Sequence, residues 1–95
     1  MTFGKAIELL KTGRLVRRRE WKDVRWLLLV QGAVRKLDPG ATYTVNLLRL
    51  GYTEGYSEIK SHIDIHIGEG CMQPGWTPTQ ADMLAGDWEL VEQNA

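Results

Sequence analysis

The nine residues Ile59-Lys60-Ser61-His62-Ile63-Asp64-Ile65-His66-Ile67 alternate apolar and polar side chains along almost their whole length. A period of two is typical of a half-buried antiparallel strand, because successive side chains of a strand point to opposite faces of the sheet. The odd-numbered residues are expected to face the core, and the even-numbered ones, including both histidines, to form a solvated face. The pattern predicts a fold built on an antiparallel sheet with one buried face.

Two short helices are expected to pack on this sheet. Apolar residues recur at helical spacing across residues 2–13, with Thr2 as the expected N-cap and Gly13 just past the helix end. The second helix is predicted over residues 78–85, because Thr77-Pro78-Thr79-Gln80 has the pattern of a capping box with proline in the first helical position.

Further strands are predicted on both sides of the alternating segment. A short strand is expected within residues 14–21, another at Trp26-Leu27-Leu28-Leu29-Val30, and a last one over residues 87–92. Gln31-Gly32 resembles a two-residue turn, so residues 33–37 are expected to pair back on the preceding strand as a hairpin.

Two stretches carry a weaker pattern. Residues 41–58 fit a strand or a short helix equally well, and residues 68–75 are predicted to form a loop that carries Cys71. The fold class predicted from all these elements is α+β, a small antiparallel sheet with two short helices. The chain is expected to be a single domain over residues 1–95, with a variable insert at residues 38–62.

The size and composition of the chain limit its class. A chain of 95 residues buries about 65% of its unfolded surface, which supports one marginally stable domain and makes oligomerisation a natural source of further burial. The single cysteine excludes an intrachain disulfide framework and a zinc site made of cysteines alone. The longest apolar run is too short to cross a bilayer, and no signal-peptide segment is recognised, so a soluble protein of a reducing compartment is expected.

Charge is balanced overall but divided along the chain. Residues 1–36 hold ten of the twelve basic residues and three acids, whereas residues 37–95 hold two basic residues and nine acids. A net charge of zero argues against general attraction to nucleic acid, although a local basic patch around Arg17-Arg18-Arg19 keeps a nucleic-acid-binding module as the alternative function. The opposite charges are expected to meet either inside the fold or between subunits.

The polar residues of the alternating segment also raise the question of a metal site. His62, Asp64 and His66 share one face, and such a trio is chemically suited to a divalent metal and to hydrolysis. Strand residues four apart are separated by about 13 Å, however, because the rise per residue is about 3.3 Å. One metal with ligands near 2 Å does not bridge that distance. No metal, no cofactor and no catalytic residue is therefore assigned.

The two ends of the chain resemble a known family. The opening Met1-Thr2-Phe3-Gly4-Lys5-Ala6-Ile7-Glu8-Leu9-Leu10-Lys11-Thr12-Gly13-Arg14-Leu15-Val16-Arg17-Arg18, closed by Trp21, and the terminal Trp76-Thr77-Pro78-Thr79-Gln80-Ala81-Asp82-Met83-Leu84-Ala85-Gly86-Asp87-Trp88 are similar to motifs of the second type of Thoeris anti-defence protein. The sequence departs from that pattern at Lys22-Asp23-Val24-Arg25, where the family usually has an Asn-Gly-Lys-Gly-like turn, and in the middle of the chain.

The resemblance implies a function as well as a family. It implies a small non-enzymatic phage protein that acts as a sponge in the cytoplasm of the infected bacterium. Such a protein binds glycocyclic ADP-ribose, the signal that the Thoeris TIR enzyme makes, and so keeps the Thoeris effector inactive. Family members form homotetramers with ligand pockets between protomers, and some also take up cyclic oligonucleotides.

The ligand implied by this resemblance leads to candidate binding residues. A cyclic ADP-ribose requires donors for its pyrophosphate, an aromatic face for adenine and polar groups for the ribose hydroxyls. Arg18 is the first choice for the phosphates, with Arg17 as the alternate. Trp21 is expected to stack on the base with Trp76 as a second wall, whereas Trp88 is assigned to the core. Thr79, Gln80 and Asp82 complete the set with a hydroxyl, an amide and a carboxylate. Gln80 has an alternative role in the helix cap, and Asp82 has one as a solvated helix residue. The candidate ligand-binding residues are Arg18, Trp21, Trp76, Thr79, Gln80 and Asp82.

Overall fold

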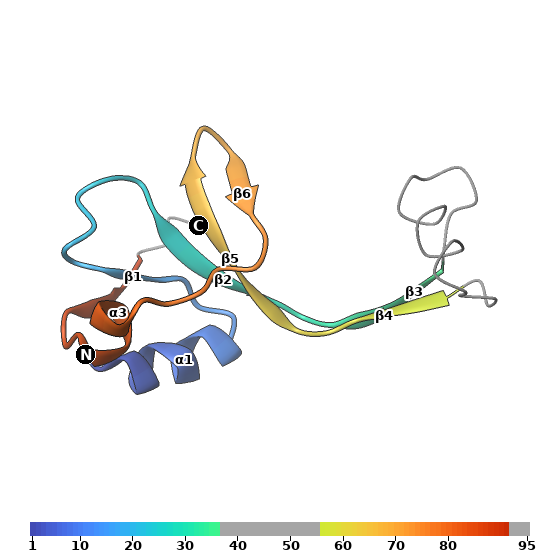
Figure 1. The fold of residues 1–95 in the computed structure, drawn as a ribbon, viewed down its shortest axis with the longest axis horizontal. Helices are drawn as coiled ribbons and strands as arrows, with labels where there is room; N and C mark the ends of the chain where they lie inside the picture. Colours follow the sequence, from blue (N-terminus) through green and yellow to red (C-terminus); the bar gives the residue numbers. More distant parts are fainter. Residues whose placement is uncertain (37–55, 92–95) are drawn as a thin grey trace. The chain divides into compact units, whose positions relative to one another are not determined.

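A computed structural model describes residues 1–36 and 56–91 of the chain (Figure 1). Its residues fall into two compact units. The first unit joins Met1–Val30 to His62–Ala95, and the second is Gln31–Ser61. The segment 38–55 of the predicted insert lies outside the described residues, as does most of the stretch 41–58.

The first unit is a five-stranded antiparallel sheet with two helices (Figure 1). The strand order is β6-β5-β2-β1-β7, and every neighbouring pair is antiparallel. The predicted α+β class is therefore confirmed. The elements are α1 (Phe3–Lys11), β1 (Val16–Arg18), β2 (Trp26–Val30), β5 (His62–Gly68), β6 (Cys71–Gln73), α3 (Gln80–Leu84) and β7 (Trp88–Leu90).

The core lies between α1 and one face of this sheet. Leu27 on β2 pairs with Ile65 on β5, and both are buried, whereas Leu29 and Ile63 in the next same-face pair pack against the core from its edge. Helix α1 contacts β1, β2 and β7 and also α3. The buried apolar residues are Ala6, Leu10, Val16, Trp21, Leu27, Ile65 and Trp88.

The caps of the two helices show one confirmed and one wrong prediction. Thr2 caps α1 by accepting a hydrogen bond from the Lys5 N–H at 3.2 Å, and Gly13 follows the helix with a φ of 89°, as predicted. The cap of α3 is Thr79 rather than Thr77. Thr79 and Asp82 exchange side-chain-to-backbone hydrogen bonds in a capping box, and a charged carboxylate accepts such a bond more strongly than the amide of the predicted box.

The strand pairing in the second unit shows that the predicted hairpin is wrong. Strand β3 (Ala33–Lys36) pairs with β4 (Tyr56–Ile59) in a two-stranded sheet, not with β2. Gln31-Gly32 is therefore not a turn. In this unit Ala33 lies opposite Ile59 and Lys36 opposite Tyr56, and the pairing stops before Gly32.

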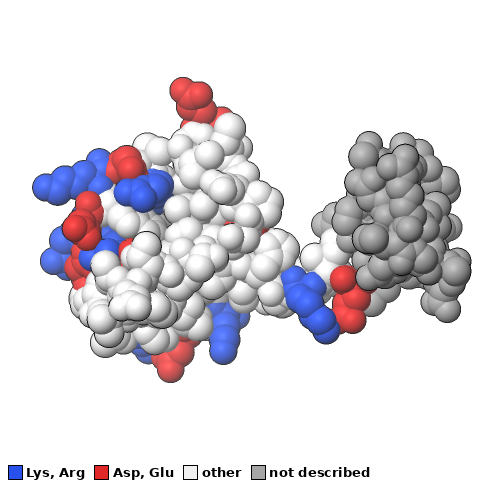
Figure 2. Space-filling model, viewed as in Figure 1, with Lys and Arg blue, Asp and Glu red and all other residues white. Residues whose placement is uncertain are grey.

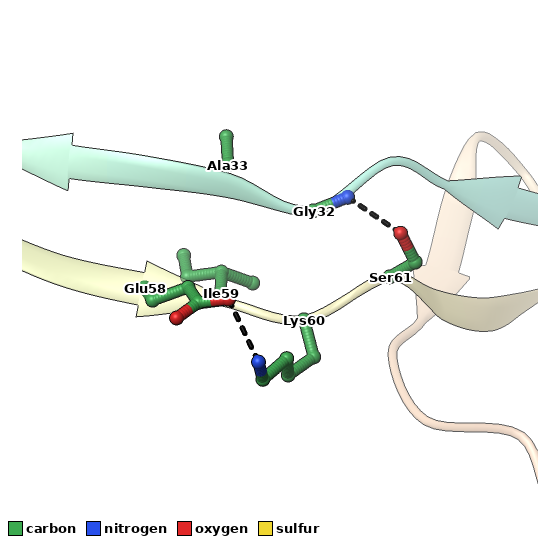
Figure 3. Close-up of a pocket in the computed structure, with 6 residues that line it drawn as sticks. All are labelled: Gly32, Ala33, Glu58, Ile59, Lys60 and Ser61. Carbon is green, nitrogen blue, oxygen red and sulfur yellow. Dashed lines mark hydrogen bonds and ion pairs between the residues drawn. The ribbon is translucent and has the colours of Figure 1, made fainter.

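Gly32 explains why the ladder is interrupted there. A Cβ atom at this position would lie 2.5 Å from the Ile59 carbonyl oxygen and 2.7 Å from the Ser61 nitrogen. Only glycine allows two backbones to approach so closely, which is a recognised reason for glycine inside a strand pattern. The Gly32 N–H donates instead to the Ser61 hydroxyl at 2.9 Å (Figure 3). A shallow hollow of about 340 Å³ surrounds this point, lined by Gly32, Ala33, Glu58, Ile59, Lys60 and Ser61.

The predicted loop over residues 68–75 is also partly wrong, because Cys71–Gln73 forms strand β6 on the edge of the sheet. The connecting turn has Glu69 and Gly70 at positive φ, 55° and 72°. Two such residues in succession match the twist of a hairpin, whereas a bulge between His66 and Gly68 shifts the register beside it. The sequence offered Glu-Gly rather than the stronger Asn-Gly signal.

Candidate functional site

The structure brings most of the predicted ligand residues to one corner of the first unit, where β1, β7, α3 and the β1–β2 loop meet. Arg18, Asp82 and Thr79 are joined by hydrogen bonds, and Trp21 contacts Trp76. Gln80 is the first residue of α3 and is exposed. Most of the predicted set is thus a spatial cluster, but Arg18, Thr79 and Asp82 use their polar groups within the chain.

Arg18 is the centre of this cluster. Only 9% of the residue is exposed. Its guanidinium donates to Asp82 Oδ1 at 3.0 Å and to Asp87 Oδ1 at 2.9 Å, and its Nη2 lies 2.6 Å from Glu20 Oε2. The hydrogen bonds to Asp87 and Asp82 raise the pKa of Arg18. The assignment of Arg18 to phosphate binding stays a prediction, and a phosphate would have to share this buried guanidinium with three carboxylates.

Asp82 is a buried acceptor rather than a solvated helix residue. Its Oδ1 accepts from Arg18, its Oδ2 accepts from the Thr79 N–H at 2.9 Å, and its own carbonyl accepts from the Trp88 indole N–H at 2.9 Å. Burial alone would raise the pKa of Asp82, but the hydrogen bonds from Thr79 and Arg18 outweigh it and hold this pKa below its usual value. The Thr79 hydroxyl is used as the cap.

Three of the four tryptophans, Trp21, Trp76 and Trp88, form one aromatic cluster. The ring centroids of Trp21 and Trp76 lie 6.2 Å apart and those of Trp21 and Trp88 lie 5.4 Å apart, both edge-to-face. Phe3 joins from α1, 5.3 Å from Trp88. Trp88 is 1% exposed, which confirms its predicted place in the core, but Trp21 is buried as well, at 6%. The two predicted walls therefore touch each other instead of standing apart.

Two further arginines contact the β1–β2 loop: Arg17, the predicted alternate for the phosphates, and Arg25, which is not among the predicted ligand residues. Arg25 donates through Nε to both carboxylate oxygens of Asp23, and its guanidinium lies 5.0 Å from the Trp21 ring centroid. Arg17 donates to the carbonyls of Asp23 and Trp21. The side-chain and backbone hydrogen bonds from Arg25 lower the pKa of Asp23. The closeness of Trp21, Asp23 and Arg25 in the sequence is a signal that could have indicated this arrangement.

The row of polar residues on β5 is less solvated than predicted. Asp64 is only 8% exposed. It accepts a hydrogen bond from the Gly75 N–H at 3.1 Å and lies 3.3 Å from His62 Nε2. His66 stacks on Trp26 at 4.4 Å, with 12° between the ring planes. The segment after β6 runs back beside β5 and places the Gly75 N–H near Asp64. A backbone N–H in such a position requires an acceptor, and the Asp64 carboxylate supplies it.

The opposite charges of the two halves of the sequence meet inside the fold. Besides the Arg18 cluster, Arg17 and Arg19 lie 3.7 Å and 3.5 Å from the two carboxylate oxygens of Glu89 on β7. Basic and acidic side chains interleave on the face of the first unit shown in Figure 2. The basic run Arg17-Arg18-Arg19 is thus neutralised by neighbouring acids, which weakens the nucleic-acid alternative.

The comparison with protein families decides the class. The model of the Thoeris anti-defense 2-like domain matches residues 1–91, nearly the whole chain. The chain belongs to this family. The predicted resemblance is confirmed, and the match extends from the two end motifs across the middle of the sequence.

Membership of the Thoeris anti-defense 2-like family supports a role against the Thoeris defence. No protein of curated function matches the chain in sequence. Within residues 1–36 and 56–91, neither helix is long and apolar enough to cross a membrane.

Proposed function

We propose that this Thoeris anti-defense 2-like protein binds a cyclic ADP-ribose-type signalling nucleotide and holds it without degrading it. Removal of the signal then leaves the Thoeris effector inactive. The family match over residues 1–91 is the observation that carries the proposal. In the described residues, the supporting feature is the meeting of an aromatic cluster with an arginine-bearing loop.

The contact between the aromatic cluster and the arginine-bearing loop supplies the kinds of group that a cyclic ADP-ribose requires. A pyrophosphate binds guanidinium groups in a bidentate manner, and adenine stacks on an indole face. The side chain of Arg25 is 41% exposed and lies over the Trp21 ring. An arginine and an aromatic face in contact supply both interactions within the length of one nucleotide.

Holding without turnover is consistent with how the carboxylates of the corner are used. Asp82 and Asp87 both accept hydrogen bonds from Arg18, and their pKa values are lowered. Carboxylates of lowered pKa stay ionised at neutral pH and are poor general acids. Their role in the fold is structural, so we assign this corner to binding rather than to catalysis.

We further propose that the protein works as a homotetramer in the cytoplasm of the infected bacterium, with ligand pockets between protomers. Large apolar side chains exposed on the described part of the chain support self-association, because their burial in an interface is favourable. Leu84 on α3 is 85% exposed and Met83 beside it is 45% exposed. The other exposed large apolar residues are Val24, Ile67, Met72 and Leu90.

Calorimetric titration with glycocyclic ADP-ribose, on protein whose mass in solution is measured by light scattering, tests the proposal. Saturable binding is expected, with a dissociation constant near 1 nM, which corresponds to about −12 kcal/mol. A whole-number ratio of ligand to oligomer is expected as well. A lack of saturable heat at micromolar protein would refute binding of this nucleotide, and cyclic oligonucleotides would be the next ligands to titrate.

A further inference from the structure

We propose that Arg25, rather than Arg18, is the arginine that binds the pyrophosphate, and that it does so by leaving Asp23 and the face of Trp21. This inference rests on the proposed function, because it assigns a residue to the binding of the same nucleotide. It also makes the β1–β2 loop, residues 19–25, a determinant of which anionic ligand the chain accepts.

The first step of the argument is the availability of the two guanidinium groups. The side chain of Arg18 is 11% exposed and is shared among three carboxylates. The side chain of Arg25 is 41% exposed, and within the described part of the chain its ion pair is with Asp23, whose own side chain is 54% exposed. An exposed single pair is weak and screened by water, whereas a buried network is costly to open. Phosphate therefore competes for Arg25 far more easily.

The second step is the similarity of the present partner to the proposed one. Arg25 Nε lies 2.9 Å and 3.0 Å from the two oxygens of Asp23. Guanidinium groups bind carboxylates and phosphates through the same planar arrangement of donors. A pyrophosphate that approaches the loop can thus replace the Asp23 carboxylate as the acceptor of the same N–H groups.

The third step couples the phosphate to the base. The Arg25 guanidinium lies 5.0 Å from the Trp21 ring centroid. The contacts of Trp21 with Trp76 and Trp88 are edge-to-face, with 77° between the planes in each pair. When Arg25 turns toward a pyrophosphate, it uncovers the indole face that it now occupies. Adenine then stacks where the guanidinium lay, so one side-chain movement serves both parts of the ligand.

The fourth step is that the loop backbone is held independently of Arg25. Arg17 donates from Nη1 to the Asp23 carbonyl at 3.2 Å and from Nη2 to the Trp21 carbonyl. These contacts fix the backbone on both sides of Lys22. Arg17 is therefore a positioning residue, and the Arg25 side chain is able to move while the loop stays in place.

Inorganic pyrophosphate is the probe that tests the arginine itself. Full-length protein is titrated with it while the arginine Nε–Hε resonances are followed by NMR, and each is assigned by single substitution. We expect a saturable shift of the Arg25 resonance and none of the Arg18 resonance. A shift of Arg18 without Arg25, or no shift of either, would overturn the inference.

Asp23→Asn gives the sharper test, because it shows whether Asp23 competes with pyrophosphate for Arg25 or supports the site. Asparagine keeps a carbonyl oxygen for the Arg25 N–H groups but has no charge, so pyrophosphate should bind several-fold more tightly. Weaker or unchanged binding would show that Asp23 supports the site and does not compete for it. Amide spectra of each variant show whether its fold is intact.

Titration with glycocyclic ADP-ribose distinguishes this inference from the proposed function. Arg25→Ala should weaken binding at least ten-fold, Arg25→Lys should restore it only in part, and the exposed control Arg14→Ala should bind as the parent does. Equal binding by the parent and Arg25→Ala would refute the inference and leave the proposed function standing. A parent that ignores the nucleotide while pyrophosphate still shifts Arg25 would refute the proposed function and support the anion site.

Discussion

The Arg18 guanidinium lies 3.0 Å from Asp82 Oδ1, a contact between residues 64 positions apart in the sequence. It joins strand β1 to helix α3, and thereby the N-terminal motif of the family resemblance to its C-terminal motif. Backbone contacts reinforce the junction, since the Trp88 N–H donates to the Met1 carbonyl at 3.1 Å. The residues of the two motifs thus meet at one corner of the fold.

Removal of the Asp82 carboxylate should be strongly destabilising. Asp82→Ala leaves the buried Arg18 with one fewer partner and removes half of the α3 capping box. Loss of one partner of a buried ion pair costs about 3–5 kcal/mol. Urea unfolding of this variant against Glu8→Ala, whose side chain is 71% exposed, measures the difference. A loss no larger than that of the control would contradict the central place of this pair.

The two threonines before α3, Thr77 and Thr79, give a matched test of the cap. Thr79→Ala should lower the free energy of unfolding by about 1 kcal/mol, because the Asp82 N–H loses its acceptor. Thr77→Ala should have little effect, since Thr77 is exposed and lies outside the capping box. Thermal unfolding followed by circular dichroism compares the two variants. If Thr77→Ala were the less stable variant, Thr77 would be the cap, as predicted from the sequence.

Acid should destabilise the fold through the same corner. Hydrogen bonds from Arg18 lower the pKa of Asp87, and the balance of contacts lowers that of Asp82. A carboxyl whose pKa is lower in the folded state contributes stability that is fully present above its unfolded pKa of about 3.9 and is lost as pH falls through the folded value. Urea midpoints should therefore change little from this source between pH 7 and 5 and decline below about pH 4. A decline that persists unchanged in Asp87→Asn would assign it to other groups.

Gly32 should tolerate no side chain, in contrast to Gly86. A Cβ at Gly32 would lie 2.5 Å from the Ile59 carbonyl oxygen, whereas nothing lies within 4 Å of a Cβ at Gly86. Gly32→Ala is expected to disturb the pairing of β3 with β4, and Gly86→Ala to be close to neutral. Hydrogen exchange of the amides in residues 33–36 and 56–59 reads this out directly. Equal protection in both variants would show that the backbones around Gly32 move apart without weakening the pairing of β3 with β4.

Local patterns predicted most of the first unit. Helical spacing with Thr2 and Gly13 placed α1, and the apolar run placed β2. The alternating segment 59–67 was predicted as one strand and covers most of β5, but Ile59 is the last residue of β4 and β5 begins only at His62. These signals succeed because each depends on residues close in sequence and on an element that buries one of its faces. The predicted cap of α3 failed because two overlapping capping-box patterns compete, one with Gln80 and one with Asp82. The charge of the Asp82 carboxylate and its contact with the distant Arg18 both favour the second.

The candidate site was harder to predict because its geometry depends on long-range contacts. The ligand implied by the family resemblance led to the prediction that Arg18 and Trp21 face it. In the structure, Trp21 is packed against Trp76 and Trp88, and Arg18 is held by carboxylates of α3 and of the residue before β7. The sequence does not show which arginine of a basic run meets which acid of the other half. The hairpin predicted at Gln31-Gly32 failed for a similar reason, since β2 has its partners in β1 and β5.

The most direct test of the central claim is a depletion and recovery experiment. Purified protein is mixed with glycocyclic ADP-ribose and removed by filtration, and the nucleotide left in the filtrate is measured by chromatography. The retained protein is then denatured by heat and the released nucleotide is measured again. The account predicts depletion in proportion to the protein added, followed by recovery of the intact nucleotide. Depletion without recovery would reveal cleavage, and a filtrate that keeps all of its nucleotide would show that this signal is not bound.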